Sequence, residues 1–427
     1  MFLFNINIKK NKNKQIKMKI LKYIFLFLLV SINALEATSG YNVVLNDASS
    51  TIDGTKIGST AVNGVSYSNG VLSITQTGTF ILSGTLNGQI KVNTSGSVSL
   101  VLNGVTIKNS NSNAIYIEKA YELDSSSFNY NTAKSLDVTK SGIKIIIADG
   151  TENTINGGKS SAGDGAIHSA VSMLVTGETK GDGVLCVIGS SEGIETEKHF
   201  FLSGGILKVS AQDDAINAKT DKSCIVTISG GKLLINSGLG NEGDGVDSNG
   251  YILVTGGEVI SAAKPGADTG LDADQGTIIN GGSVFSVGSS MDMASTSSSQ
   301  PTMNLIFNSN VAASSTVTVK DSNGNEIISY CANSADFISG TERRTYIAAV
   351  VSHPSFKANG VYHLYMDGTQ LGYTGNEGGH GPGGQGGPGG QGGPGGNSGS
   401  SSSSGEIKTD FTLGSSATNF SGVQKAL

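Results

Sequence analysis

The feature that most constrains the fold is a glycine pair that recurs at nearly constant spacing. Gly-Gly stands at positions 204–205, 230–231, 256–257 and 281–282, at intervals of 26, 26 and 25 residues. Each pair precedes alternating apolar and polar residues, as in GGILKVSA and GGSVFSVG, which is the period of a β-strand. The pattern predicts stacked strands, with glycines at corners that require positive φ or close backbone approach. It leaves no place for helices.

A second motif runs in step with the glycine pairs. An apolar residue lies between polar or small neighbours at five places, spaced by 27, 22, 30 and 25 residues: Ile167, Ile194, Ile216, Val246 and Leu271. Two independent signals with a shared mean period near 26 residues indicate successive turns of one repeat structure. Alternating apolar and polar residues, with weaker motifs, extend upstream to Tyr41.

The composition agrees with a repeat fold. Gly accounts for 61 of 427 residues, Trp is absent, and charged residues make up 15%. Such a chain buries many small, similar layers rather than a core of large side chains. The predicted fold class is all-β: a right-handed parallel β-helix, or solenoid, over residues 38–288, with C-terminal β coils forming a cap over 289–373 and a disordered Gly/Ser tail.

The two ends of the chain have a different character. A lysine-rich stretch precedes an apolar run from Ile24 to Ile32, which is the layout of a signal peptide. We therefore expect residues 1–37 to be a signal peptide and N-terminal extension, and the protein to be secreted. Residues 374–405 form a Gly/Ser-rich linker, and 406–427 form a C-terminal tail whose role the sequence leaves open.

Charge limits the classes of partner. The formal net charge is −6, and only Arg343 and Arg344 are arginines, so the basic surface that nucleic-acid binding requires is missing. We expect no nucleic-acid partner, no membrane association after signal cleavage, and a monomer. One disulfide among Cys186, Cys224 and Cys331 is conceivable in a secreted chain, but small buried side chains fit their apolar surroundings better.

Acidic residues recur in register with the second motif. In stacked strands, equivalent positions lie about 4.7–4.9 Å apart, and the residue after each apolar member points away from the core. The first column, at that position, contains His168, Glu195, Asn217, Asp247 and Asp272. The second column, two residues before each apolar member, contains Gly165, Glu192, Asp214, Asp244 and Thr269. Further acids lie nearby at Asp164, Asp213, Asp268 and Asp274.

Stacked carboxylates need relief from their mutual repulsion. Two of them about 5 Å apart repel by about 3–4 kcal/mol at an effective dielectric near 20. Protons can neutralise them, or calcium can bind among carboxylate, amide and backbone oxygens. The alternative is a solvated acidic face without metal. Because the acids recur in register, we predict calcium ligands at Glu192, Glu195, Asp213, Asp214, Asn217, Asp244, Asp247 and Asp272.

Three runs carry a family resemblance: GIETEKHFFLSGGILKVSAQDDAINA, GDGVDSNGYILVTGGEV and TGLDADQGTIINGGSV. They resemble a family of secreted carbohydrate-binding proteins with a pectate-lyase-like parallel β-helix, whose members are associated with cellulose and acidic sugars and bind calcium. The likeness extends roughly from Tyr41 to Asp367. It implies calcium ligation by the acids of the two columns, whereas His168 and Thr269 depart from the acidic pattern.

These observations favour binding over catalysis, and we assign no catalytic residue. The expected function is calcium-dependent binding of a polysaccharide, either cellulose or an acidic, uronic-acid polymer. One alternative is a calcium-assisted polysaccharide lyase, which needs a strong base; Lys198, Lys219 and Lys264 are the candidates. Another is a non-catalytic surface or matrix structural protein.

Overall fold

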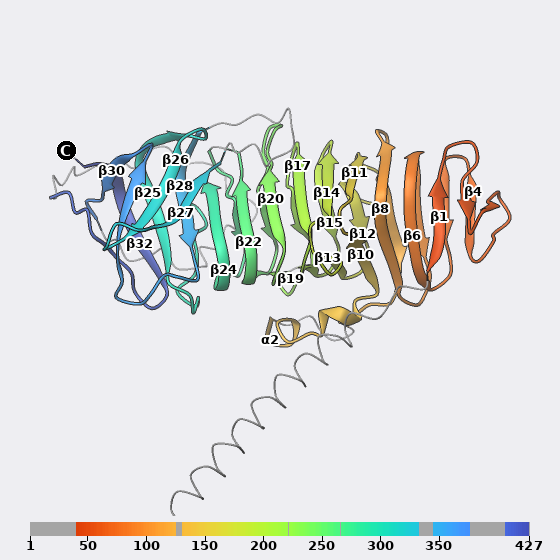
Figure 1. Cartoon of the computed structure of the whole chain (residues 1–427), viewed down its shortest axis with the longest axis horizontal. Coiled ribbons are helices and arrows are strands. Elements are labelled where there is room, and N and C mark those ends of the chain that lie inside the picture. Colours follow the sequence, from red (N-terminus) through yellow and green to blue (C-terminus); the bar gives the residue numbers. More distant parts are fainter. Residues whose placement is uncertain are drawn as a thin grey trace, which may run out of the picture. The chain divides into compact units, whose positions relative to one another are not determined.

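Parallel strand pairs make up most of the structure (Figure 1). The computed structural model describes residues 40–124, 130–220, 222–264, 266–332, 345–375 and 406–426. The expected signal peptide, both arginines and all but the first two residues of the Gly/Ser linker lie outside these residues. Within the described ranges, no helix has the length and apolarity that a membrane span requires.

Sheet B positions the two columns. Its middle and C-terminal strands each supply one turn of the second motif, and their parallel pairing places Ile167, Ile194, Ile216, Val246 and Leu271 in one register. This alignment confirms the predicted periodicity. The sheet contains β4 (Val65–Ser68), β5 (Val71–Ile74), β7 (Gln89–Asn93), β9 (Ile115–Lys119), β12 (Gly165–Ser169), β15 (Glu192–Thr196), β18 (Ile216–Ala218), β21 (Val246–Ser248) and β23 (Leu271–Ala273).

Sheet A corrects the predicted fold class. Ten of its described strands are joined by parallel pairings into a closed ring. In order around the ring they are β8 (Val98–Asn109), β10 (Ile143–Ile147), β13 (Met173–Gly177), β16 (Phe200–Leu202), β19 (Ile225–Ile228), β22 (Tyr251–Ala262), β20 (Lys232–Asn236), β17 (Ile206–Ala211), β14 (Val184–Gly189) and β11 (Glu152–Gly157). By this connectivity sheet A is a closed ten-strand parallel β-barrel, and the prediction of an open right-handed parallel β-helix solenoid is wrong.

Two long strands close the ring. β8 and β22 are each 12 residues long and continue around a glycine corner, so each pairs with strands on both sides of that corner. The corner glycines have positive φ, +75° at Gly104 and +78° at Gly257. A Cβ on Gly257 would also lie 2.8 Å from the Gly231 carbonyl oxygen of the neighbouring corner. The predicted corner role of the glycine pairs is therefore confirmed.

Antiparallel strands cover the ends of the parallel stack. At the N-terminal end β1 (Tyr41–Leu45) pairs with β2 (Thr51–Ile52), which pairs with β3 (Thr55–Lys56), and β6 (Gly78–Asn87) links β1 to β8. At the other end β28 (Thr345–Ser352) runs antiparallel to both β24 (Gly276–Gly288) and β25 (Thr302–Ala312). The remaining strands there are β26 (Thr316–Asp321), β27 (Glu326–Cys331), β29 (Val361–Met366) and β30 (Thr369–Gly372).

The C-terminal residues belong to the fold. β31 (Phe411–Thr412) pairs with β29, and β32 (Ala417–Lys425) lies parallel to β25 and antiparallel to β30. Phe411 and Phe420 are completely buried in a hydrophobic cluster with residues of β25 and β28. Residues 406–426 are thus a structural part of the C-terminal region rather than a free tail.

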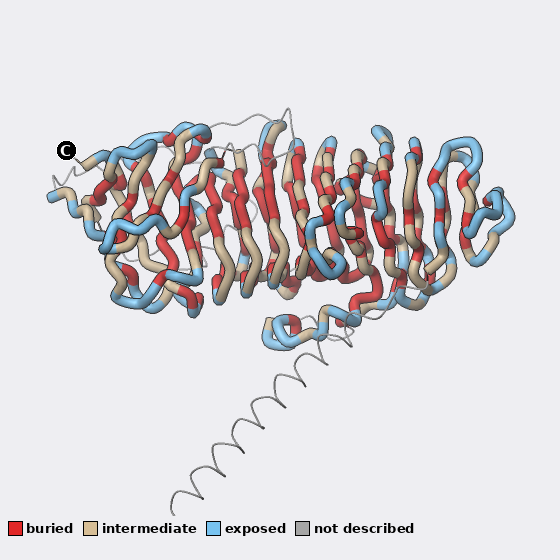
Figure 2. Tube along the Cα trace, in the orientation of Figure 1, coloured by how far each residue is buried: buried red, intermediate tan, exposed pale blue. Residues whose placement is uncertain are grey.

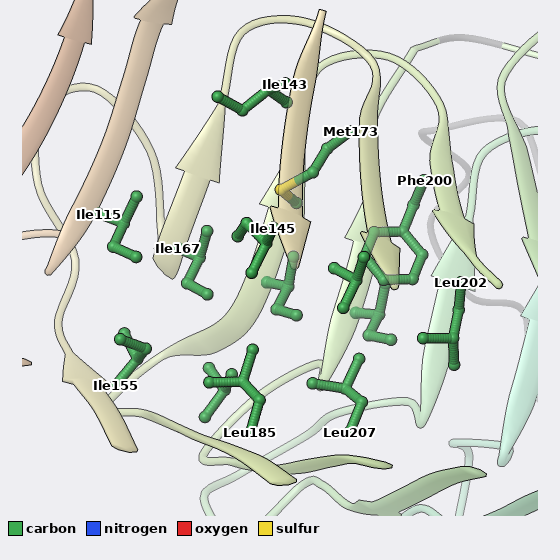
Figure 3. Close-up of a cluster of buried hydrophobic side chains, with 14 of the residues drawn as sticks. Ile115, Ile143, Ile145, Ile155, Ile167, Met173, Leu185, Phe200, Leu202 and Leu207 are labelled. Atoms are coloured by element: carbon green, nitrogen blue, oxygen red, sulfur yellow. The ribbon is translucent and has the colours of Figure 1, made fainter. Parts of the chain in front are cut away.

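The core consists of apolar side chains stacked layer on layer. β10 alternates buried and half-buried residues, and its Ile145 packs in a cluster with Ile167 and Leu185 from sheet B and the opposite side of sheet A (Figure 3). Figure 2 shows buried positions recurring along every strand of the stack. None of the three cysteines is paired, and Cys224 is fully buried, as the apolar sequence context indicated.

An insertion between β9 and β10 contains the described helices: α2 (Tyr130–Ala133) and a 3₁₀ turn (Val138–Lys140). Its apolar residues pack against a third cluster on the outer face of sheet A that includes Phe201 and Leu253. The buried His199 holds the insertion in place. Its Nδ1 accepts from the Ile225 N–H, so Nε2 carries the proton that bonds Asp124 Oδ2 at 3.1 Å.

Candidate functional site

The first column forms one continuous register across sheet B. His168, Glu195, Asn217, Asp247 and Asp272 pair in sequence through β12, β15, β18, β21 and β23. The same register continues on the N-terminal side as Tyr116 and Lys91, so the column changes from basic and aromatic to acidic along the sheet. The second column runs alongside; its Gly165 pairs with Glu192, and the Asp244 N–H donates to Asp214 Oδ1 at 2.7 Å.

The middle of the first column is buried. His168 is 2%, Glu195 0% and Asn217 8% exposed. The chain before β12 covers them closely: a Cβ on Gly163 would lie 2.1 Å from His168 Nδ1 and 2.3 Å from Glu195 Oε2. A solvated acidic face therefore does not describe these positions, although Asp247 and Asp272 are half-exposed.

Glu195 is an ionised, fully engaged carboxylate. Its Oε2 bonds His168 Nδ1 at 2.8 Å and accepts from the Gly165 N–H at 3.2 Å and the Asp164 N–H, while Oε1 pairs with the Lys219 ammonium. Burial alone would raise the pKa of Glu195, but the hydrogen bonds from His168 and Lys219 outweigh it and lower the pKa to about 2. Protein donors thus occupy this predicted calcium ligand.

Glu192 and Asn217 differ from Glu195 in that each has a side-chain oxygen without a hydrogen-bond partner. Asn217 Nδ2 donates to Glu192 Oε1 at 3.1 Å and to Asp214 Oδ2 at 3.2 Å. Glu192 Oε2 and Asn217 Oδ1 are buried without any hydrogen-bond partner. Glu192, Asn217 and Asp214 therefore converge at a place where two oxygens have no hydrogen-bond partner. Buried oxygens without a partner are costly and rare.

Burial and mutual repulsion raise the pKa values of the other acids. Burial, with the charges of Glu195 and Asp214, raises the pKa of Glu192 to about 9. Burial and Asp247 raise the pKa of Asp214 to about 8, and similar causes raise Asp244 to about 7 and Asp247 to about 6. Without a cation, the columns therefore hold protons at neutral pH.

The last rung contains an acid that the sequence pattern missed. Burial and Asp292 raise the pKa of Asp272 to about 9, and burial also raises the pKa of Asp292. Asp292 lies beyond the last turn of the second motif, so only its acidic character in the serine-rich run after β24 could have drawn notice. Asp213 lies beside the columns, where burial and Glu242 raise its pKa.

Comparison with known proteins identifies the family. A family model described as "Carbohydrate-binding domain-containing protein" matches residues 68–335, which is more than half of the 427-residue chain. The chain belongs to this carbohydrate-binding family. The matched residues include both columns, so the carbohydrate-binding domain contains the candidate site. The predicted family resemblance is confirmed as to carbohydrate binding, whereas the fold it implied is corrected above.

One solved structure is similar to this carbohydrate-binding protein. It is described as the polysaccharide lyase-like protein from C. thermocellum, in a gadolinium derivative. The two share 23% sequence identity, with 57% of this chain and 92% of that chain covered and a TM-score of 0.40. No curated protein matches the chain.

Two places in the carbohydrate-binding domain could bind a hard cation: the surroundings of Glu195, and the surroundings of Glu192 and Asn217. The second fits such an ion better. Within the described ranges, the group of three potential ligands whose atoms lie within 4.8 Å of one another is His168, Glu195 and Glu197. Glu195, however, is occupied by four protein donors, one of them the Lys219 ammonium, which would repel a metal ion. Glu192 and Asn217 offer unpartnered oxygens, which is the donor set that calcium prefers.

Proposed function

We propose that this family member is a secreted, calcium-dependent binding protein for polysaccharides, either cellulose or acidic, uronic-acid polymers. Carbohydrate binding is the property of the family to which the chain belongs. Secretion is supported by the lysine-rich and apolar N-terminal sequence. Calcium dependence is supported by the chemistry of the two columns.

The main support for calcium dependence is that two buried oxygens, Glu192 Oε2 and Asn217 Oδ1, have no hydrogen-bond partner. Together with the Asp214 carboxylate they would supply carboxylate and amide ligands to one ion, leaving other coordination positions for water or sugar oxygens. When bound, calcium would supply positive charge that attracts sugar hydroxyl or carboxylate oxygens. The protein residues would hold the ion, and the Glu195 hydrogen bonds would fix β15, the strand that also carries Glu192.

Lysine chemistry gives little support to the lyase alternative. A catalytic base must be neutral when it accepts a proton. Burial lowers the pKa of Lys219, but the hydrogen bond and charge of Glu195 outweigh it and raise the pKa above its ordinary value. Lys264 Nζ donates to the Gly240 carbonyl oxygen at 3.1 Å. Among the described residues, Lys219 is thus held protonated beside the column, and the geometry favours binding.

Binding to insoluble cellulose and to polygalacturonate, measured with calcium and with chelator, tests the proposal. Glu192→Gln preserves the side-chain shape but leaves no carboxyl group that could ionise to bind the ion. We expect it to weaken calcium-dependent polysaccharide binding about tenfold or more and to abolish the rise in melting temperature that calcium gives the parent.

Glu118→Gln is the matched control, since Glu118 also lies on sheet B but forms a half-exposed ion pair with Lys91 at 3.0 Å. It should bind calcium and polysaccharide as the parent does. Parent protein that binds both polymers equally well in chelator would refute the calcium dependence. Parent protein that binds neither polymer would refute the proposed ligands.

A further inference from the structure

The last described segment of the chain, residues 406–426, lies between strands that precede it in the sequence. Its β32 pairs in parallel with β25, from Thr302 to Phe307, and antiparallel with β30. Its β31 pairs antiparallel with β29. Without the segment, β25 and β30 would each lose a hydrogen-bonded neighbour, and an unpaired strand edge is a template for another strand.

The apolar side chains of the segment fill the space among these strands. Phe411 and Leu413 are buried on either side of the exposed Thr412. Phe420 is completely buried. The ring centroids of Phe411 and Phe420 are 5.0 Å apart, and each lies 4.9 Å from that of Tyr373. This arrangement is typical of a bound strand, in which main-chain hydrogen bonds give affinity and alternate side chains give specificity.

Polar contacts fix the register of the segment. Asn304 Nδ2 donates to Asn419 Oδ1 at 2.8 Å, and Asn308 Nδ2 donates to Gln424 Oε1 at 2.7 Å. A slip of one residue would break both bonds and turn the apolar side chains to the opposite face. The surrounding strands therefore recognise one sequence in one register.

The segment is joined covalently to these strands through the Gly/Ser-rich linker alone, since residues 406–427 contain no cysteine. We propose that β25, β29 and β30 form a donor-strand site whose ligand is residues 406–426. The site binds this segment whether or not the linker joins the two, and it therefore also accepts the same segment from a second copy of the chain. This interaction depends on neither calcium nor sugar binding.

Cutting the linker tests the inference on the full chain. A protease recognition sequence inserted after Gly390 allows the folded protein to be cleaved into two pieces. The pieces should elute together from a size-exclusion column in native buffer and separate in urea. Pieces that separate in native buffer would overturn the inference.

A labelled peptide of residues 406–427 tests binding of a segment supplied from outside. The cleaved protein would be unfolded in urea and refolded with about a tenfold excess of this peptide. Because the peptide and the original segment compete for one site, about nine in ten molecules should carry the label.

Peptide variants show whether the buried side chains direct this binding. Phe420→Ala in the peptide should weaken binding about a hundredfold, as expected for the loss of a buried ring. Thr412→Ala is the matched control, because Thr412 is exposed on β31, and it should compete as well as the parent peptide. Refolded protein that excludes the parent peptide, or that takes up Phe420→Ala equally well, contradicts the proposed site.

Discussion

Replacing Glu195 with Gln tests whether this carboxylate stabilises the fold rather than binding a cation. The pKa of Glu195 is lowered from 4.5 to about 2 in the folded protein, and each unit corresponds to about 1.36 kcal/mol. The parent should therefore exceed Glu195→Gln by about 3 kcal/mol in free energy of unfolding at neutral pH. Because the folded-state pKa is depressed, this advantage is complete above pH 4.5 and is lost as the pH falls toward 2.

Urea unfolding at pH 7 and at pH 3.5, each with calcium and with chelator, measures this difference. We expect the same loss with and without calcium, since His168 and Lys219 rather than a metal occupy the carboxylate. Glu118→Gln should cost under about 1 kcal/mol, as is usual for a half-exposed ion pair. A loss below about 1 kcal/mol for Glu195→Gln, or a loss seen only with calcium, would refute the reasoning.

Three further outcomes follow from the structure. In chelator, the melting temperature should fall from pH 6 to pH 9, because pKa values raised to about 8 at Asp214 and about 9 at Glu192 make the folded state bind more protons than the unfolded state over this range and lose stability as the pH rises; a calorimetric profile that stays flat contradicts this. Asp244→Asn combined with Asp247→Asn should bind calcium more weakly in titration calorimetry yet lose less melting temperature on chelation than the parent, and a larger loss would count against column repulsion. A chain ending at Gly375 should melt at a lower temperature by circular dichroism, because it lacks β31 and β32 with buried side chains such as Phe420, each worth roughly 2 kcal/mol; an unchanged melt would show that these strands contribute little.

The local features of the fold were predictable because they depend on neighbouring residues. Positive φ at Gly257 and its equivalents follows from the glycine pairs, and the common register of Ile167 and Ile194 follows from the motif spacing. The closure of sheet A was not predictable in this way. It depends on β8 and β22 continuing through a corner, and the sequence period does not distinguish a corner that ends a strand from one that bends it.

In the candidate site, too, features that depend on strand pairing were predictable, whereas features that depend on loops were not. The order of residues in the first column could be predicted, since strand pairing at constant period fixes it. Burial of Glu195 could not, because it results from loop residues near Gly163 and from Lys219 on the next rung. Asp292 escaped prediction for a similar reason: it reaches Asp272 from a segment outside the repeat.

The parallel pairing of β32 with β25 has a consequence for when the protein can finish folding. Thr302 pairs with Ala417, so β25 must wait for a strand that is synthesised long after it. Chains fold from the N-terminus during synthesis, and pairings between distant residues form slowly. Sheet B and the ring of sheet A can assemble while the rest is still being made, whereas the C-terminal region can close only after β32 (Ala417–Lys425) has emerged. Premature termination would thus leave the hydrophobic cluster around β25 open, which is a surface that quality-control proteases and chaperones recognise.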